Sequence, residues 1–337
     1  MENINIPYNE LRDLTVSLLK SKGLNEFDSS VIADYFIRVE AMGIKTHGYT
    51  TLKSHINKIE NNQYNLNAVI QTKRVMDSVL VADSDNSIGM ISATKLMNIC
   101  IQEAKNHGMY IVHCNNANTF GAASYYCNLA VQSGLIGITF SNSPAAMAPW
   151  GGIDNLLGTN PFSIGIPSNN YAPFIFDMSS SIVAKSKINS ARIEGKKIPE
   201  GWAIDSQGNP TIDPLEAIKG SLLPVGEHKG YGIAMMIDIM AGLLSGAAFQ
   251  SKVKKFYRES DEGSMNVGQV FIVIDPVRIY GENFYNKMDE YLENIKASKP
   301  INKYSNIRYP GEHLNLRLKC SLESGIEMNK KLFEELF

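Results

Sequence analysis

The amino-acid sequence predicts an α/β protein with a helical N-terminal segment. Apolar residues recur at helical spacing through the first sixty residues. From about residue 67 onward, short runs rich in β-branched residues alternate with helical patterns. The chain has 337 residues, of which 44% are hydrophobic and 20% are charged, so it can bury a sizeable core.

Three helices are expected in the N-terminal segment. The first runs from Pro7, a residue that suits the first turn of a helix, to Gly23. The second runs from Asn25, which can cap a helix, to Gly43. A third, shorter helix is expected after His47.

The rest of the chain alternates between the two kinds of pattern. Strands are expected at 69–75, 79–82, 109–114, 135–141, 162–166, 174–177 and 267–274. Helices are expected at 89–106, 122–132, 231–244 and 282–296. The segment 195–226 contains four prolines and is expected to be rich in loops. This alternation favours a sheet that helices cover on both faces.

The expected elements suggest two units built from discontinuous parts of the chain. Residues 1–77 and 226–337 are expected to form a helical unit that mediates dimerisation and lies on the substrate side. Residues 78–225 are expected to form an α/β unit that binds a cofactor.

Charge and composition exclude several classes of function. The net charge is −2 and the basic clusters are short, so nucleic acid and anionic membranes are not expected partners. The most apolar stretch, 232–249, is interrupted by Asp238 and Ser245, so a buried helix is expected there and no membrane span. The N-terminus resembles no signal peptide, and the four cysteines have no metal-ligand spacing. We therefore expect a cytoplasmic protein with reduced thiols and no metal site.

The glycine-rich fingerprint of the classical dinucleotide fold, GxGxxG, is absent, as is the phosphate-binding GxxxxGK[ST]. The chain shows instead a dense set of motifs rich in glycine and proline between residues 141 and 246. A lysine beside a glycine at the start of a helix, as at Lys229, suits a phosphate. Asp177, at the end of a strand and followed after Met178 by three serines, offers an acceptor for ribose hydroxyls. Tight turns and helix caps are the alternative interpretation of the same motifs.

These motifs resemble those of the malate/L-lactate dehydrogenase family, which lacks the classical Rossmann fold and includes ureidoglycolate, sulfolactate and 2,3-diketogulonate oxidoreductases. The matching segments are Ala-Pro-Trp-Gly-Gly (148–152), Leu-Gly-Thr-Asn-Pro (157–161), Ile-Pro-Glu-Gly-Trp-Ala (198–203), Asp-Pro (213–214), Leu-Leu-Pro (222–224) and His-Lys-Gly-Tyr-Gly (228–232). Weaker matches are Thr-His-Gly (46–48) and Pro-Gly-Glu (310–312). The resemblance implies a non-classical, three-layer α/β dinucleotide-binding fold and a homodimer with active sites near the subunit interface.

The resemblance also implies an activity and its residues. Members bind NAD(H) or NADP(H) and reversibly reduce 2-oxo acids or related imines. By motif, the cofactor would contact Ser143, Asp177, Met178, Ser179, His228, Lys229, Pro310, Gly311 and Glu312. His47 matches the histidine of the family's Ser-His-Gly motif, the proposed proton donor to the carbonyl oxygen, a role that suits a group titrating near neutrality.

Three departures from the family fall on the expected substrate side. Thr46 replaces the serine before the histidine and keeps its hydroxyl. Thr51 stands where the family usually has an arginine that could grip a substrate carboxylate. Thr119 stands where a second histidine, the acid/base in some members, would be. We therefore expect a non-standard substrate, with Lys45, Lys53 or a lysine of a partner subunit as the substitute cation.

Three functional alternatives follow from the sequence. The leading one is an NAD(P)-dependent oxidoreductase that transfers a hydride between nicotinamide and a 2-oxo or 2-hydroxy acid-like substrate. The second is a cyclic-imine reductase, and the third is a non-catalytic dinucleotide-binding homologue. NAD is the expected cofactor and NADP the alternative, since the 2′-phosphate would need a nearby cation such as Lys185, Lys187 or Arg192.

Overall fold

The computed structural model, which describes residues 2–256, 263–302 and 306–337, is built around a mixed seven-stranded sheet. The strand order is β2-β3-β4-β11-β5-β6-β7, and β3 and β4 pair in parallel while the other neighbours are antiparallel. The strands are β2 (Gln71–Met76), β3 (Val79–Asp83), β4 (Met109–Ala117), β5 (Ile136–Ser141), β6 (Phe162–Ile166), β7 (Phe174–Met178) and β11 (Val267–Ile274). The predicted α/β class is confirmed.

β11 occupies the centre of this sheet. It pairs with β4 on one side and with β5 on the other, although it follows β5 by more than a hundred residues. β2 and β11 therefore share one sheet with strands of the 78–225 segment, although the predicted division assigns them to the other unit. The division into two units stays a prediction.

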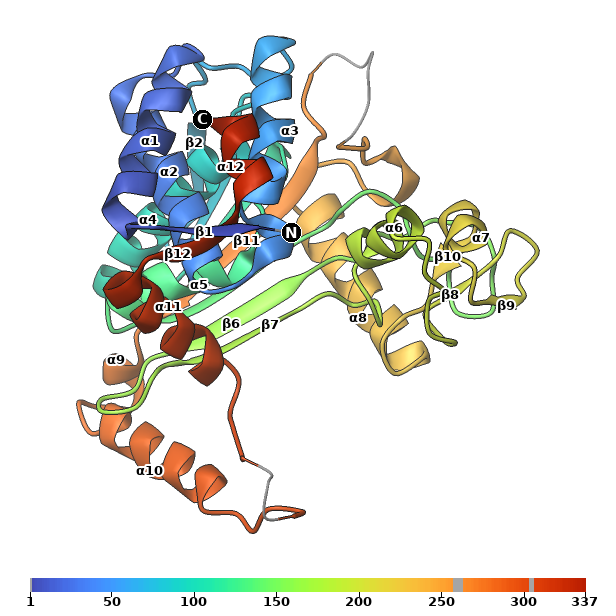
Figure 1. Cartoon of the computed structure of the whole chain (residues 1–337). Helices are drawn as coiled ribbons and strands as arrows, with labels where there is room; N and C mark the ends of the chain where they lie inside the picture. Colours follow the sequence, from blue (N-terminus) through green and yellow to red (C-terminus); the bar gives the residue numbers. More distant parts are fainter. Residues whose placement is uncertain (1, 257–262, 303–305) are drawn as a thin grey trace.

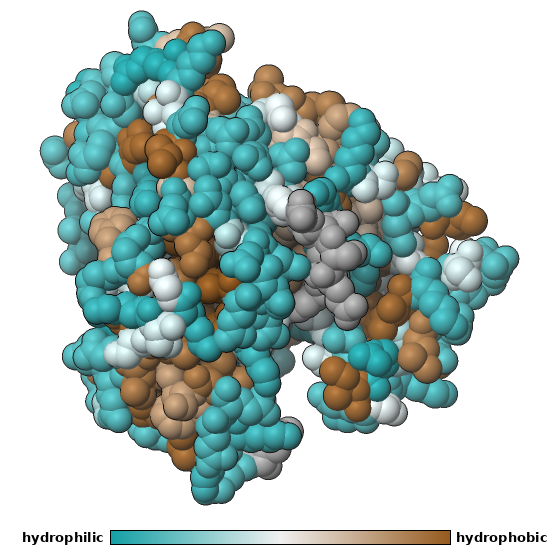
Figure 2. All heavy atoms as spheres, turned by 90° about the horizontal axis from the view of Figure 1, so that it is seen from above, coloured by the Kyte–Doolittle hydropathy of each residue, from teal (hydrophilic) through white to brown (hydrophobic). Residues whose placement is uncertain are grey.

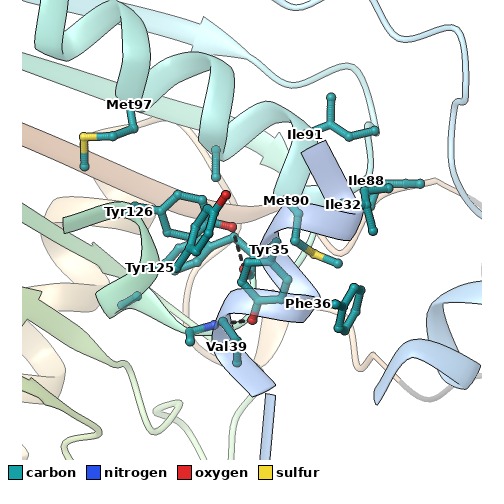
Figure 3. Close-up of a cluster of buried hydrophobic side chains, with 14 of the residues drawn as sticks. Ile32, Tyr35, Phe36, Val39, Ile88, Met90, Ile91, Met97, Tyr125 and Tyr126 are labelled. Atoms are coloured by element: carbon teal, nitrogen blue, oxygen red, sulfur yellow. Dashed lines mark hydrogen bonds between the residues drawn. The ribbon is translucent and has the colours of Figure 1, made fainter. Parts of the chain in front are cut away.

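Five helices cover one face of the sheet, and the largest hydrophobic core lies between them and the sheet. They are α1 (Tyr8–Ser21), α2 (Glu26–Ala41), α3 (Tyr49–Glu60), α4 (Gly89–His107) and α5 (Ala123–Gln132). Tyr35 of α2 lies fully buried in this core against Tyr125 and Tyr126 of α5 (Figure 3). The core thus fixes α2 relative to α5, and both helices lead into segments that carry predicted site residues.

A second helical segment covers the opposite face. α8 (His228–Ile237) continues into η2 (Asp238–Leu243), a π-helical segment. Ile237 and Ala241 are fully buried against Phe140 and Val270 of the sheet. Phe271, the residue after Val270 in β11, belongs to the first core on the other face. The alternation of apolar residues on both faces of β11 explains why its sequence is an almost continuous apolar run.

The segment from Lys185 to Leu222 forms a smaller lobe beside the sheet (Figure 1). It contains α6 (Lys185–Ile193), β8 (Ala203–Ile204), β9 (Pro210–Thr211), α7 (Pro214–Lys219) and β10 (Ser221–Leu222), with the three strands in a small sheet. The expectation of a loop-rich segment at 195–226 was incomplete, because two-residue strands and a six-residue helix are too short to produce a periodic pattern.

The two ends of the chain lie side by side. β1 (Asn3–Ile6) pairs with β12 (Ile326–Asn329) in an antiparallel ribbon. The remaining elements are η1 (Lys45–His47), η3 (Gln250–Lys252), α9 (Pro276–Tyr280), α10 (Phe284–Lys296), α11 (Glu312–Ser324) and α12 (Lys330–Leu336). Within the described residues, no helix combines the length and the apolar character that crossing a membrane requires.

Candidate active site

One cavity of about 610 Å³ brings together residues from distant parts of the chain. Its wall includes η1, the 119–122 loop, the segments that end β5 and β7, and the start of α6. Seven of the predicted site residues line it: Thr46, His47, Thr119, Ser143, Asp177, Met178 and Ser179. The volume is that of an ordinary ligand pocket. Figure 2 shows the molecule from above, with a notch between the larger body and the smaller lobe.

The segment that carries His47 is anchored from below by a buried carboxylate. Glu40, only 4% exposed, accepts hydrogen bonds from the backbone N–H of Tyr49 at 3.0 Å and from Lys45 Nζ at 2.5 Å. A Cβ on Gly48 would lie 2.0 Å from Glu40 Oε2, so only glycine lets the carboxylate approach this closely. The glycine after His47 is therefore explained by packing.

Tyr35 links His47 to the loop on the other side of the cavity. Its hydroxyl accepts a hydrogen bond from the N–H of Ala122 at 2.7 Å and donates one to the carbonyl of His47 at 3.3 Å. Burial raises the pKa of Tyr35, so the hydroxyl stays protonated. Gly121 lies directly over this hydroxyl, with a φ of 79°. One buried phenol thus sets the spacing between η1 and the 119–122 loop.

Asp177 lies at the end of β7 and faces the first turn of α5. Its Oδ2 accepts a hydrogen bond from the N–H of Ser124 at 3.0 Å, near the helix N-terminus that favours negative charge. Protein atoms crowded around Asp177, whose surface opens onto the cavity, raise its pKa, while the hydrogen bonding at Ser124 and the charge of His47 lower it. The carboxylate is therefore held in place with its remaining acceptor capacity open to the cavity.

His47 and Asp177 influence each other electrostatically across the cavity. Protein atoms crowd around His47, although its surface opens onto the cavity and stays accessible to solvent. This crowding lowers the pKa of His47 below its ordinary value of 6.5, and the Asp177 carboxylate acts in the opposite direction. An imidazole in this setting can both accept and donate a proton near neutral pH.

Ser143 is positioned by an asparagine that sequence reasoning did not single out. Asn160, fully buried with a φ of 22°, accepts a hydrogen bond from the N–H of Ser143 at 3.0 Å. Its amide nitrogen donates to the carbonyl of Ala234 in α8 at 2.8 Å. The Leu-Gly-Thr-Asn-Pro motif at 157–161 could have pointed to this residue, whereas Tyr35 and Glu40 had no comparable signal.

Several predicted site residues lie outside the cavity lining. His228 and Lys229 are exposed at the start of α8, where Gly230 contacts the carbonyl of Ser180, next to Ser179. The carbonyl of Pro310 accepts the N–H of Ile175 at 3.0 Å, which places the predicted 310–312 segment against β7, two residues from Asp177.

The substituted position and the candidate cations also lie elsewhere. The hydroxyl of Thr51 donates to the carbonyl of Gly48 at 2.9 Å, inside the first turn of α3, and does not line the cavity. Lys45 is paired with Glu40, and Lys53 with Glu335 at 2.9 Å. Among the described residues that line the cavity, Lys185 is the one lysine, and no arginine is present.

His55 of α3 predicts how stability depends on pH. It is 5% exposed, its Nδ1 lies 2.9 Å from the hydroxyl of Tyr64, and burial lowers its pKa from 6.5 to about 3. Below pH 6.5 His55 binds a proton in the unfolded chain but not in the folded chain. The folded state is therefore stabilised less and less as the pH falls from 6.5 towards 3. The free energy of unfolding should fall by about 2 kcal/mol between pH 6.5 and 5 from this group alone.

Urea denaturation at pH 7 and pH 5 measures this effect when wild type is compared with His55→Phe. The variant keeps an aromatic ring in the core but cannot titrate, so its loss of stability should be smaller. Equal losses in both proteins would show that His55 does not contribute.

Comparison with known proteins identifies the family. A family model described as malate/L-lactate dehydrogenase matches residues 6–337. The chain belongs to the malate/L-lactate dehydrogenase family. The predicted resemblance is thereby confirmed over almost the whole sequence.

Relatives in this family are named dehydrogenases. The chain is 37% identical over 328 residues to a malate/(S)-sulfolactate dehydrogenase of Methanothermus fervidus, covering 97% of this chain and 94% of the relative. It is 30% identical to a (2R)-3-sulfolactate dehydrogenase (NADP(+)) of Chromohalobacter salexigens, with coverage of 98% and 96%. It is 28% identical to a ureidoglycolate dehydrogenase (NAD(+)) of Escherichia coli, with coverage of 97% and 93%. The predicted class, an oxidoreductase, is confirmed.

Solved structures agree with this assignment. The sulfolactate dehydrogenase of Methanocaldococcus jannaschii superimposes with a TM-score of 0.90 at 35% identity, covering 99% of this chain and 95% of that chain. The Δ1-piperideine-2-carboxylate reductase of Pseudomonas syringae gives a TM-score of 0.88 at 25% identity, with coverage of 99% and 98%. The same fold therefore occurs in dehydrogenases and in a reductase.

Proposed function

We propose that this protein transfers a hydride between a nicotinamide cofactor and a 2-oxo or 2-hydroxy acid-like substrate, with a specificity that differs from that of ordinary family members. The observation that carries the proposal is that His47, Asp177, Ser143 and Ser179 line one cavity, with His47 and Asp177 close enough to influence each other electrostatically. A proton-transfer group and a strip of polar groups that suits a nucleotide are both needed for this reaction.

The residues present fit a dinucleotide. Asp177 lines the cavity and uses one carboxylate oxygen for the N–H of Ser124. Glu312 Oε2 is buried without a donor within the described chain, in the 310–312 segment that contacts β7. We assign Asp177 and Glu312 as acceptors for ribose hydroxyls, which would satisfy such atoms.

The remaining cofactor contacts follow the motifs. We propose that Ser143, Met178 and Ser179 line the nicotinamide end, and that His228, Lys229, Pro310 and Gly311 hold the phosphate and ribose groups. The cofactor, when bound, supplies or accepts the hydride. NAD is the proposed form, with NADP as the alternative, because relatives of both types are known by name.

His47 is the proposed proton-transfer residue. In reduction, hydride addition at the carbonyl carbon leaves an alkoxide, and the protonated imidazole gives its proton to that oxygen. In oxidation, the neutral imidazole takes the hydroxyl proton. Thr119 lines the same cavity, but a hydroxyl cannot change charge near neutral pH, so we assign Thr119 and Thr46 to hydrogen bonding with the substrate.

Substrate specificity is the finer part of the proposal. Without an arginine at position 51, a 2-oxo acid lacks the expected bidentate partner, and losing such a pair costs about 2–5 kcal/mol. We expect kcat/KM for pyruvate to lie roughly 30- to 4000-fold below that of the best substrate. Steady-state rates on pyruvate, oxaloacetate and a panel of larger 2-oxo acids measure this, and efficient turnover of pyruvate would contradict it.

A cyclic-imine reductase is the second candidate. The likeness to Δ1-piperideine-2-carboxylate reductase favours it, because a proton donor and a hydride serve C=N and C=O bonds with the same geometry. Including a cyclic imine carboxylate in the panel separates the two. Cofactor binding without turnover of any panel member would favour a non-catalytic homologue.

The fold detail is proposed as a non-classical, three-layer dinucleotide-binding fold. Two observations support it: within the described strands only β3 and β4 are parallel neighbours, and the chain lacks GxGxxG. We also propose a cytoplasmic location, supported by the four free cysteines, of which Cys100, Cys114 and Cys127 are buried.

We further propose a homodimer that uses one face of α8 and η2. Met236, Ile239, Leu243 and Leu244 are 51%, 47%, 52% and 59% exposed, an apolar surface that is unusual for a monomer. Since Gly230 of α8 packs against Ser180, a second copy bound here would lie close to the cavity.

Sedimentation equilibrium tests the dimer. Wild type should sediment as a dimer at micromolar concentration, and Leu243→Asp should shift the protein to monomer. Ile279→Asp, at a residue 76% exposed on α9, is the matched control and should stay dimeric. A monomeric wild type would contradict the proposal.

A further inference from the structure

Asp238 is a buried carboxylate that neither lines the cavity nor takes part in the proposed reaction. It lies in η2, the π-helical segment that follows α8, and is 5% exposed. π-helical turns are rare and are found frequently at functional sites. No basic side chain of the described chain forms an ion pair with Asp238, so hydrogen bonds alone stabilise its charge.

Asn142 connects this carboxylate to the cavity wall. It is 2% exposed and belongs to the 141–143 segment, which lines the cavity at the end of β5. Its Nδ2 donates hydrogen bonds to Asp238 Oδ1 at 2.9 Å and to the carbonyl of Ala248 at 2.8 Å. Its Oδ1 accepts the N–H of Gly268 at 2.8 Å. The amide group is therefore fully used in holding the wall to η2 and to β11.

The charge of Asp238 fixes which way this amide points. An ionised carboxylate can only accept hydrogen bonds, so Nδ2 of Asn142 must face it and Oδ1 must face Gly268. The second oxygen of Asp238 accepts the N–H of Gln250 at 3.0 Å, so the carboxylate is held from two sides. Burial raises the pKa of Asp238, whereas the hydrogen bonds from Asn142 and Gln250 lower it.

A second asparagine ties the same wall to the preceding helical turn. Asn160 accepts the N–H of Ser143 at 3.0 Å and donates to the carbonyl of Ala234 in α8 at 2.8 Å. Ala234 and Asp238 are four residues apart, about one turn of helix. The 141–143 segment is thus fixed at two successive turns of α8 and η2, which set its position in the cavity.

We propose that Asp238 is a positioning residue for nicotinamide binding, which acts through Asn142 by holding the 141–143 wall where the nicotinamide end is received. The inference rests on the proposed function, since it requires a dinucleotide in the cavity. A wall that is held in advance loses less conformational freedom when the cofactor binds, so the affinity for the nicotinamide end rises. The phosphate and ribose groups gain nothing, because their proposed contacts lie elsewhere, at 228–229 and 310–312.

Comparing NADH with ADP-ribose, which lacks the nicotinamide ring, tests this proposal without relying on turnover. Both ligands are titrated calorimetrically into wild type and Asp238→Asn. The new amide keeps the size of the side chain, but its Nδ2 faces one of the two donors that Asp238 accepts. The Kd for NADH should rise roughly tenfold or more, while that for ADP-ribose changes less than about twofold.

A second variant, Asn142→Ser, should give the same split, because serine is too short to reach Asp238. Circular dichroism shows that each variant is folded. If the protein prefers NADP, the ligand pair becomes NADPH and 2′-phospho-ADP-ribose.

The control is Asp275→Asn, the same chemical change at the other end of β11. Asp275 accepts the N–H of Val277 at 2.9 Å and lies outside the cavity lining, so both Kd values should stay unchanged. Equal losses for the two ligands in Asp238→Asn would show a merely structural role and overturn the proposal, as would an unchanged Kd for NADH. A wild-type protein that binds neither dinucleotide would instead contradict the proposed function itself.

Discussion

Replacing His47 by alanine is expected to lower kcat about 10²- to 10⁴-fold, the usual contribution of a positioned acid/base. No other histidine lines the described cavity, and Thr119 cannot substitute because its hydroxyl does not titrate near neutral pH. The anchoring of this segment by Glu40 and Tyr35 acts through the backbone, so it survives the substitution. The Kd for NADH, measured by fluorescence titration, should therefore stay unchanged.

The pH dependence of His47→Ala separates proton transfer from positioning. In wild type, oxidation of the alcohol needs the neutral imidazole, so its rate should fall as pH drops through the pKa of His47, below 6.5. The residual activity of the His47→Ala variant should not show this fall in rate at low pH. His107→Ala is the control, since His107 pairs with Glu103 outside the cavity. Wild-type kcat in His47→Ala would contradict the assigned role.

Replacing Gly121 by alanine is expected to destabilise the protein by about 2–4 kcal/mol and to lower activity. A Cβ at this position would lie 1.8 Å from the hydroxyl oxygen of Tyr35 and 2.5 Å from its Cζ. Tyr35 is fully buried and packed against three other aromatic rings, so it cannot move aside (Figure 3). The loop must shift instead, which breaks the bond from Ala122 N–H and moves Thr119 relative to His47.

Chemical denaturation with a matched glycine measures this effect. Gly195 also has a positive φ, of 65°, but a Cβ at this position would meet no other atom within 4 Å. Its replacement by alanine therefore strains the backbone without creating a steric clash. Gly195→Ala should therefore lose only about 1 kcal/mol. Adding Tyr35→Phe to Gly121→Ala removes the nearest clashing atom, so the two effects should be less than additive. Equal losses in the two glycine variants would show that the contact with Tyr35 does not matter.

The order of strands in the sheet was beyond the reach of sequence patterns. The bounds of β6 and β11 were predicted correctly at 162–166 and 267–274, and α4 to within one residue. These elements have strong local periodicity, which the sequence displays directly. The insertion of β11 between β4 and β5 depends on hydrogen bonds between residues more than a hundred positions apart, which no local pattern encodes.

The same distinction between local and long-range information applies to the candidate site. The sequence by itself determined the family and singled out His47, Ser143 and Asp177, because motifs record which residue types a backbone turn requires. Only the tertiary structure decided which of them share a cavity, that Tyr35 and Glu40 hold the His47 segment, and that Thr51 faces its own helix turn. The physical reason is that burial, hydrogen bonding and charge pairing are relations between distant segments, which exist only once the chain has folded.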